Sequence, residues 1–197
     1  MAVRVLVIGN ALTVVAGYES GAVACFRQAR GAFERVFLRK MHAQPVLSLD
    51  VTADGTWAFS SGADAVVARY SLRGGDEETK VVGTKHAGQQ SLRVRKDGLV
   101  FATAGWDGRI RVYAVESMRE LAVLKWHKEG CYALAFADVL AGHETPAAQL
   151  EHDDTASLVT AQSTLSTVRQ RRLDKAQATH WIAAGSKDGK VSLWDIY

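Results

Sequence analysis

The stretch GSKDGKVSLWDI, residues 185–196, contains a tight Lys-Asp-Gly turn that is followed by a strand ending in Trp-Asp. Three upstream segments repeat the pattern: AGWDGRIRVYAV at 104–115, SGADAVVARYSL at 61–72 and, more loosely, GYESGAVACFRQ at 17–28. In all four, the turn residue precedes an aromatic residue by six positions, and the pairs are Asp188 and Trp194, Asp107 and Tyr113, Asp64 and Tyr70, and Ser20 and Phe26. The chain therefore contains an internal repeat.

A histidine lies upstream of three of these turns and begins each unit. The spacing from histidine to turn aspartate is 22 residues for His42 and 21 for His86, but 61 for His127. The difference predicts an insertion of about 40 residues in the last unit, while the turn-to-turn period before it is 44 and then 43 residues. We expect a single domain over 1–197 with approximate units 1–41, 42–85, 86–126 and 127–197.

Each unit contains short runs that are rich in β-branched and aromatic residues. In the third unit these runs are SLRVR, LVFATAG, RIRVYAV and ELAVLKWH, and Asp-Gly pairs stand between several of them. Such runs predict strands, and Asp-Gly favours a tight hairpin turn. A period near 43 residues with four antiparallel strands is typical of a propeller blade. The predicted fold class is all-β, a partial β-propeller of about three to four four-stranded antiparallel blades.

The histidine, the turn aspartate and the aromatic residue of each unit are predicted to be structural. An aspartate in a turn accepts hydrogen bonds from nearby backbone amides and from the histidine of its unit, which ties two loops together. The predicted sets are His42, Asp64 and Tyr70; His86, Asp107 and Tyr113; and His127, Asp188 and Trp194. Three catalytic or metal sites at one repeated spacing are a less economical interpretation.

Composition and motifs weigh against several classes of protein. A net charge of +3, spread along the chain, is too small for a nucleic-acid stripe or a membrane-surface patch. The apolar run in MAVRVLVIG is too short for a signal-peptide core or a membrane span. Cys25 and Cys131 lie in apolar runs and are predicted to be buried, reduced thiols rather than a disulfide or a nucleophile. Since no catalytic or phosphate-binding motif is found, we expect no enzyme, cofactor or metal, and no direct nucleic-acid or membrane partner.

The insertion at 138–179 is rich in Ala, Thr, Ser and Gln and poor in aromatic residues. This composition predicts a disordered segment inside the last blade, with a short helix within 163–177. Its RQRR stretch at 169–172 fits either a nuclear-import contact or a solvated charge run. The acidic and histidine residues of the insertion lack a recognised metal-ligand spacing.

Three segments, TAGWDGRIRVY at 103–113, LAVLKWHKEGCYALAFA at 121–137 and AAGSKDGKVSLW at 183–194, resemble the WD-repeat family. Within that family they are similar to the C-terminal blades of the ASTRA-associated branch, whose animal relatives are the G-protein β-subunit-like proteins. The resemblance covers most of the chain outside the insertion. The first unit departs from the pattern, because Ser20 replaces the turn aspartate and Phe26 the tryptophan.

The resemblance implies a closed ring, because propellers of this family close with seven blades. The last unit here lacks its outer strand after VSLWDI at 191–196. We expect the rest of a longer chain to supply the missing blades, and a second chain is the alternative.

The resemblance also implies a function. It indicates a non-catalytic scaffold of the ASTRA complex that takes part in chromatin remodelling. With a cochaperone complex, the scaffold would assist the maturation of phosphatidylinositol-3-kinase-related kinases. The implied location is the nucleus, with the cytoplasm as a further one, and the implied partners are ASTRA subunits and these cochaperones.

Two other hypotheses stay open. The first is a reader of histone tails or other peptides, which predicts a cage of aromatic and acidic side chains at the channel mouth. The second is a ubiquitin-ligase substrate adaptor. Because exposed aromatic and basic loop residues often anchor interfaces, Trp106, Lys187 and Trp126 are candidate partner contacts. For each of them, packing on the rim between blades is the structural alternative.

Overall fold

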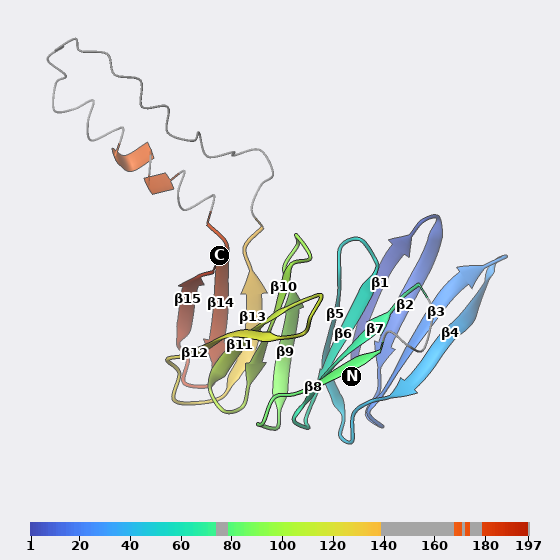
Figure 1. Ribbon diagram of the computed structural model, residues 1–197, viewed down its shortest axis with the longest axis horizontal. Coiled ribbons are helices and arrows are strands. Elements are labelled where there is room, and N and C mark those ends of the chain that lie inside the picture. The colour runs from blue at the N-terminus through green and yellow to red at the C-terminus, as the bar shows by residue number, and fades with distance from the viewer. Residues whose placement is uncertain (74–78, 139–167, 171, 174–178, 197) are drawn as a thin grey trace, which may run out of the picture.

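The computed structural model describes residues 1–73, 79–138, 168–170, 172–173 and 179–196. Their strands β1 to β15 form four antiparallel sheets that follow one another in chain order, side by side (Figure 1). Helical geometry occurs in this part of the chain only at 168–170 and 172–173. These residues lie within the segment for which a short helix is predicted.

Each sheet is a meander of consecutive strands. The first sheet contains β1 (Ala2–Ile8), β2 (Ala11–Gly17), β3 (Ala22–Ala29) and β4 (Ala32–Lys40). The second contains β5 (Val46–Val51), β6 (Trp57–Gly62), β7 (Val66–Ser71) and β8 (Lys80–Gly83). The third contains β9 (Gln89–Val94), β10 (Val100–Gly105), β11 (Arg109–Ala114) and β12 (Glu120–Lys125). The fourth contains β13 (Cys131–Phe136), β14 (Trp181–Ser186) and β15 (Val191–Asp195).

The predicted all-β fold of partial propeller blades is confirmed. Three sheets have four strands, and the fourth has three, with no strand of the described residues on the free edge of β15. The first strands of neighbouring sheets contact one another, β1 with β5, β5 with β9 and β9 with β13. These strands therefore form the inner side of the arc, and β4, β8 and β12 form its rim.

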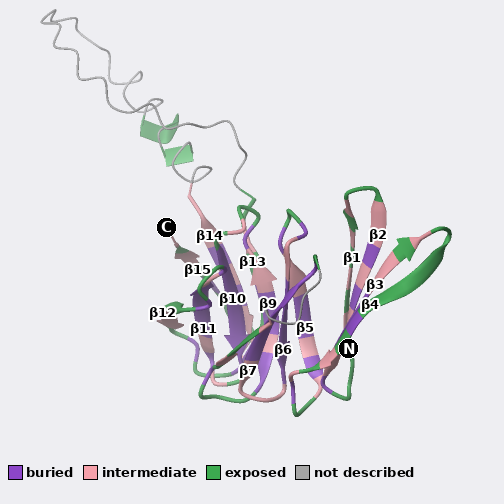
Figure 2. Cartoon of the chain, turned by 45° about the vertical axis from the view of Figure 1, so that its right-hand side comes forward, coloured by how far each residue is buried: buried purple, intermediate pink, exposed green. Residues whose placement is uncertain are grey.

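The core consists of three apolar layers, one between each pair of neighbouring sheets. Alternation along a strand sends successive side chains to opposite faces. Each sheet therefore has a back face, turned toward the preceding sheet, and a front face, turned toward the following one. Between the first two sheets, Val15 and Cys25 of a front face pack with Ala58 and Tyr70 of a back face. The buried residues concentrate in the middle sheets (Figure 2).

Tight turns join the second and third strands of the sheets. Gly108, directly after Asp107, has a φ of 73°, and a Cβ there would lie 2.8 Å from the carbonyl oxygens of His127 and Glu129. Only glycine meets both demands without strain. The predicted Asp-Gly turn thus also brings the third sheet against the loop that leads into the fourth.

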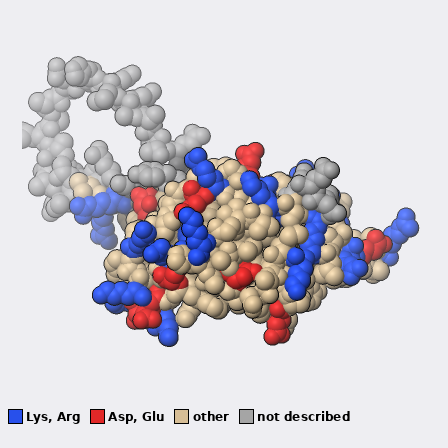
Figure 3. All heavy atoms as spheres, turned by 60° about the horizontal axis from the view of Figure 1, so that its bottom comes forward, with Lys and Arg blue, Asp and Glu red and all other residues tan. Residues whose placement is uncertain are grey.

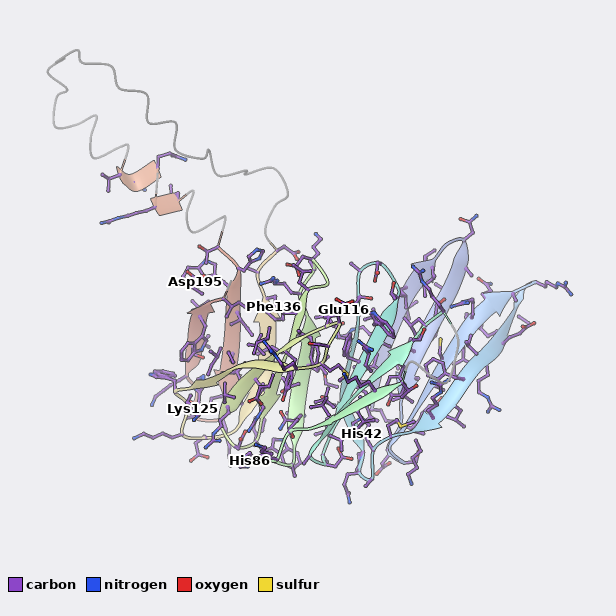
Figure 4. The ribbon with its side chains drawn as sticks, in the orientation of Figure 1. His42, His86, Glu116, Lys125, Phe136 and Asp195 are labelled. Atoms are coloured by element: carbon purple, nitrogen blue, oxygen red, sulfur yellow. The ribbon has the colours of Figure 1, made fainter. Side chains whose placement is uncertain are left out.

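The sheets have two ends. The loops 41–45, 84–88 and 126–130 between sheets lie at one end together with the turns that follow β6, β10 and β14, and we call this the histidine end. Figure 4 shows His42 and His86 there, with Glu116 and Phe136 toward the other end. Most of the insertion, for which disorder is predicted, lies outside the described residues.

Candidate functional site

The second sheet contains a buried hydrogen-bonded chain at the histidine end. His42 Nδ1 lies 2.9 Å from Asp64 Oδ1, His42 Nε2 lies 2.7 Å from Ser60 Oγ, and Ser60 Oγ lies 3.0 Å from the hydroxyl of Tyr70. Since a carboxylate only accepts, Nδ1 donates to Asp64, and in the neutral ring Nε2 accepts from Ser60. Burial raises the pKa of Tyr70 to about 12, against the hydrogen bond with Ser60. This set closes the core and offers no reactive group to solvent.

In the third sheet, a glutamine takes the place of the buried histidine. His86 is 46% exposed and its Nδ1 lies 3.9 Å from Asp107 Oδ2, beyond hydrogen-bond distance. The buried side chain of Gln89 stands inside the sheet instead. Its Oε1 accepts from Thr103 Oγ1 at 2.8 Å, and its Nε2 donates to the His86 carbonyl at 3.0 Å. The expected contact of His86 with Asp107 is therefore not a hydrogen bond.

Asp107 is held by an arginine four residues further along the chain. Arg111 Nη2 donates to Asp107 Oδ2 at 2.6 Å, and Nη1 donates to Oδ1 at 3.1 Å. Burial raises the pKa of Asp107, but the hydrogen bonds and charge of Arg111 outweigh it, so that the pKa lies below its usual value. The buried guanidinium and this carboxylate satisfy each other in a two-point contact.

The fourth sheet has a partly formed set. His127 Nε2 lies 2.8 Å from Ser192 Oγ, and Trp194 Nε1 donates to the same oxygen at 2.9 Å. His127 Nδ1 is 4.0 Å from Asp188 Oδ1 and has no hydrogen-bond partner among the described residues. The first sheet has Ser20 and Phe26 at the corresponding positions and no histidine. One repeated position thus has different polar contacts in each sheet.

Trp106 is the most clearly placed of the candidate partner contacts. Its indole is 45% exposed, and its Nε1 donates to Gln90 Oε1 at 2.9 Å. The ring lies against Gly88, where a Cβ would come within 2.1 Å of its atoms and where φ is 79°. A glycine and one hydrogen bond therefore fix an indole whose other side faces solvent.

The other two candidates lie on the same end of the molecule. Lys187 is exposed, and its backbone amide donates to the Gly130 carbonyl at 2.9 Å. Trp126 is exposed and meets the His127 ring edge-on, with centroids 4.9 Å apart. Trp126 also lines a 270 Å³ hollow with residues 191–194 along the free edge of β15.

Sequence reasoning missed Tyr132, an exposed ring whose Cε1 would lie 3.2 Å from a Cβ on Gly130. Its position as the second residue of an inner strand could have indicated from the sequence that its side chain is exposed. The same position is Leu47 in β5 and Gln90 in β9. These three positions hold one aromatic and no acidic residue, whereas the reader hypothesis predicts a cage of both.

The described residues contain no group of three His, Cys, Asp or Glu side chains that could hold a metal ion. Cys25 and Cys131 are buried free thiols, and burial raises the pKa of Cys131 to about 11. Both are therefore protonated near neutral pH and unsuited to attack a substrate. No helix in the described part of the chain is long and apolar enough to cross a membrane.

The sequence of the strands and turns agrees with a known repeat. The family profile described as "WD domain, G-beta repeat" matches residues 34–68, 79–114 and 171–195. The chain belongs to the WD-repeat family. The matched ranges fall on the second, third and fourth sheets, and the first sheet, whose turn lacks the aspartate, is matched only at its last strand.

Relatives of this WD-repeat chain agree with the predicted branch. It is 47% identical to ASTRA-associated protein 1 of Verticillium alfalfae, over 100% of the chain and 50% of that protein. It is 52% identical to ASTRA-associated protein 1 of Aspergillus flavus, over 84% of the chain and 39% of that protein. The mouse guanine nucleotide-binding protein subunit beta-like protein 1 is 29% identical, over 93% of the chain and 44% of that protein. The resemblance to this branch is confirmed, and the chain spans about half the length of the relatives it matches.

Two solved structures share the fold of the WD-repeat chain. The computationally designed Ika4 protein superposes with a TM-score of 0.64 at 18% identity, over 100% of this chain and 90% of the Ika4 chain. The designed Ika8 protein gives the same TM-score and identity, over 99% of this chain and 45% of the Ika8 chain. At this identity the likeness shows the fold alone.

Proposed function

We propose that this chain is part of a non-catalytic protein-interaction scaffold of the ASTRA complex. The single observation that carries the proposal is its 47% identity, along its whole length, to a protein named ASTRA-associated protein 1. The molecule suits such a role, since the His42 set is buried and the half-exposed indole of Trp106 is held in place by Gly88 and Gln90. In this proposal the partners are other ASTRA subunits and cochaperones of phosphatidylinositol-3-kinase-related kinases. Roles in chromatin remodelling and kinase maturation, and a nuclear location, are part of the proposal.

The proposed contact surface is the rim at the histidine end around Trp106, with Lys187 and Trp126 as neighbouring candidates. A fixed, half-exposed indole presents apolar area and loses little conformational entropy on binding. Figure 3 turns this end toward the viewer and shows basic and acidic side chains interspersed over it. A mixed surface of this kind suits a protein partner better than a uniformly charged polymer.

The test is affinity purification of the tagged chain from a fungal host, followed by mass spectrometry. ASTRA subunits and the kinase cochaperones are expected to copurify with the wild-type chain. Trp106→Ala is expected to lower their recovery at least ten-fold, because an aromatic anchor contributes about 2 kcal/mol or more. Leu99→Ala, an exposed apolar residue in a turn at the other end, is the matched control and is expected to retain them.

Circular dichroism and a thermal melt of both variants check that the fold is intact. Recovery of none of these subunits by the folded wild-type chain would contradict the proposal. Direct binding of histone-tail peptides to the purified chain at micromolar strength would favour the reader hypothesis instead.

A further inference from the structure

A β-bulge occurs at the same place in the inner strand of the second, third and fourth sheets. At the histidine end, the pairing of this strand with the next one skips one residue, which is Leu47 in β5, Gln90 in β9 and Tyr132 in β13. A bulge turns the side chain of its extra residue out of the regular alternation, and bulges are frequent beside binding sites. Since β5, β9 and β13 lie side by side (Figure 1), the three residues form a row, which we call the inner row.

A second row lies on the turns between the second and third strands of the same sheets. In each sheet, the residue before the turn aspartate donates its backbone amide, over 2.8–3.0 Å, to a carbonyl of the loop that leads into that sheet. These residues are Ala63, Trp106 and Lys187, which we call the outer row. Because the backbone makes this bond, a substitution in the outer row changes the surface and leaves the bond that holds the turn in place.

Trp106 joins the two rows. Its indole Nε1 donates to Gln90 Oε1 at 2.9 Å. A Cβ on Gly130 would lie 3.2 Å from both Trp106 Cα and Tyr132 Cε1, so the tyrosine ring and the tryptophan backbone are neighbours. Both aromatic side chains are 45% exposed. The third and fourth sheets, which pack on each other, thus present two aromatic rings and a side-chain amide at one place.

The charged side chains around these rings are mostly basic. Residues 84–88, 106–109, 126–130 and 187–190 include five basic side chains: Lys85, Arg109, Lys128, Lys187 and Lys190. Of the three carboxylates in these ranges, Asp107 and Asp188 are only 16% and 18% exposed and lie 2.6 Å from Arg111 and 3.6 Å from Lys190. The third, Glu129, is exposed. The corresponding segments of the second sheet, 41–45 and 63–65, contain one carboxylate and no lysine or arginine.

We propose that the inner and outer rows hold an extended acidic segment of a partner protein, which crosses the second, third and fourth sheets. An apolar side chain of the segment packs on Trp106 and Tyr132, and its carboxylates lie near Lys128 and Lys187. Packed sheets are about 10 Å apart and an extended chain advances about 3.3 Å per residue, so every third residue of the segment meets a new sheet. The inference rests on the proposed scaffold function, because it names the chemistry of the partner at the same surface.

The aromatic and the basic contacts have different effects in this proposal. A fixed indole and a neighbouring tyrosine ring give affinity, because they lose little conformational entropy on binding. An exposed ion pair adds little affinity by itself. Several positive side chains around the rings, however, attract an acidic segment and repel a basic one. The surface therefore favours a segment with apolar and acidic residues over a basic segment such as a histone tail.

The test is the binding of dye-labelled ten-residue peptides to the purified chain, measured by fluorescence anisotropy. The first peptide has Leu and Phe three residues apart and Asp or Glu at all other positions. The second has Lys at those other positions, and the third keeps the acidic residues but has Ser in place of Leu and Phe. We expect the first to bind at micromolar strength and the other two at least roughly ten-fold more weakly. The affinity of the first is expected to fall as the salt concentration is raised.

Variants locate the contact. Trp106→Ala is expected to weaken binding of the first peptide roughly ten-fold, and Lys187→Glu roughly three-fold with a smaller dependence on salt. Gln90→Glu keeps an oxygen that accepts from Trp106 Nε1 but adds a negative charge, so a loss of roughly three-fold is expected while the indole stays in place. Lys96→Glu changes an exposed lysine in a turn at the other end and is the matched control, with no change. Circular dichroism checks the fold of every variant.

The outcomes separate this inference from the scaffold function. No binding of the first peptide at about 1 mM, or equal binding of the second, would overturn the inference. Binding that none of the three variants weakens would place the contact elsewhere and would also overturn it. If ASTRA subunits still copurify in a way that depends on Trp106 while the acidic peptide does not bind, the scaffold function stands and the acidic chemistry is wrong. If the peptide binds as expected but no ASTRA subunit copurifies, the scaffold function alone is contradicted.

Discussion

The second and third sheets each have four strands in the same order and nearly the same register. Different polar side chains, however, occupy the buried site of the repeat's histidine in the two sheets. In the second sheet, His42 joins Asp64 to Ser60. In the third sheet, His86 lies outside and Gln89 provides the buried polar group, while Asp107 turns to Arg111. Both solutions give the turn aspartate a partner and the hydroxyl on the second strand a hydrogen bond. The fold therefore requires satisfied polar groups at this place, and histidine is one of several residues that satisfy them.

Removing the two histidines is the strongest test of this comparison. His42→Ala leaves Asp64 and Ser60 without their buried partner and opens a cavity, so a loss of about 3 kcal/mol in the free energy of unfolding is expected. His86→Ala removes a half-exposed ring that makes no side-chain hydrogen bond to Asp107, and a change below about 0.5 kcal/mol is expected. Urea unfolding of both variants and the wild type under the same conditions measures both losses. Equal losses would show that His86 has a structural role after all.

The carboxylate of the third sheet is tested by Asp107→Asn. The variant removes the close charge partner of the buried Arg111 guanidinium and leaves it only Glu120 at 3.9 Å, and partial exposure of Asp107 reduces the effect, so a loss of about 2 kcal/mol at pH 7 is expected. The folded-state pKa of Asp107 is lowered, so its contribution is present above the unfolded-state pKa, about 4, and is lost as the pH falls through the folded-state value.

The difference between wild type and Asp107→Asn is therefore expected to shrink steadily as the pH is lowered below about 4. Urea titrations at several pH values measure it. Asp195→Asn changes an exposed carboxylate of β15 and serves as the control, with a difference near zero throughout. A gap for Asp107→Asn that stays constant into acid would show that the amide also disrupts packing.

The amide of the third sheet is tested by Gln89→Ala. This variant removes two neutral hydrogen bonds from a buried site, and a loss of about 1–2 kcal/mol is expected. The side chain of its neighbour Gln90 accepts a hydrogen bond from the exposed indole of Trp106, so Gln90→Ala is the matched control, with a change below about 0.5 kcal/mol. Similar losses for the two variants in urea unfolding would refute the assignment of Gln89 as the internal substitute for histidine.

The repeat period, the strand runs and the Asp-Gly turns allowed the blades and their order to be predicted from the sequence. The spacing of His42 and Asp64 also predicted a pair that lies 2.9 Å apart. The same spacing failed for His86, because one residue fewer precedes Asp107 and a glutamine three residues later fills the space. Spacing along the chain does not tell which of two polar side chains turns inward. Tyr132 lies at the register shift between Cys131 and Ala133, where simple alternation along the strand does not predict which side chain is exposed.

The smallest expected effect concerns a buried serine hydroxyl. It lies on the second strand of the second sheet but on the third strand of the fourth sheet. In the second sheet the paired residues are Ser60 and Ala68, and in the fourth they are Ala184 and Ser192. Ser192→Ala removes the oxygen that His127 and Trp194 share, so a loss of about 1 kcal/mol is expected.

Adding Ala184→Ser to Ser192→Ala moves the hydroxyl to the place it has in the second sheet. The double variant is expected to regain at least half of the lost stability in urea unfolding, because the new oxygen lies at the same offset from the turn as Ser60. Ala184→Ser alone is the control, and it isolates the effect of adding a hydroxyl to a buried position. If the double variant is less stable than Ser192→Ala, the two sheets are not interchangeable at this position, and the polar requirement depends on the aromatic residue, Tyr70 in one and Trp194 in the other.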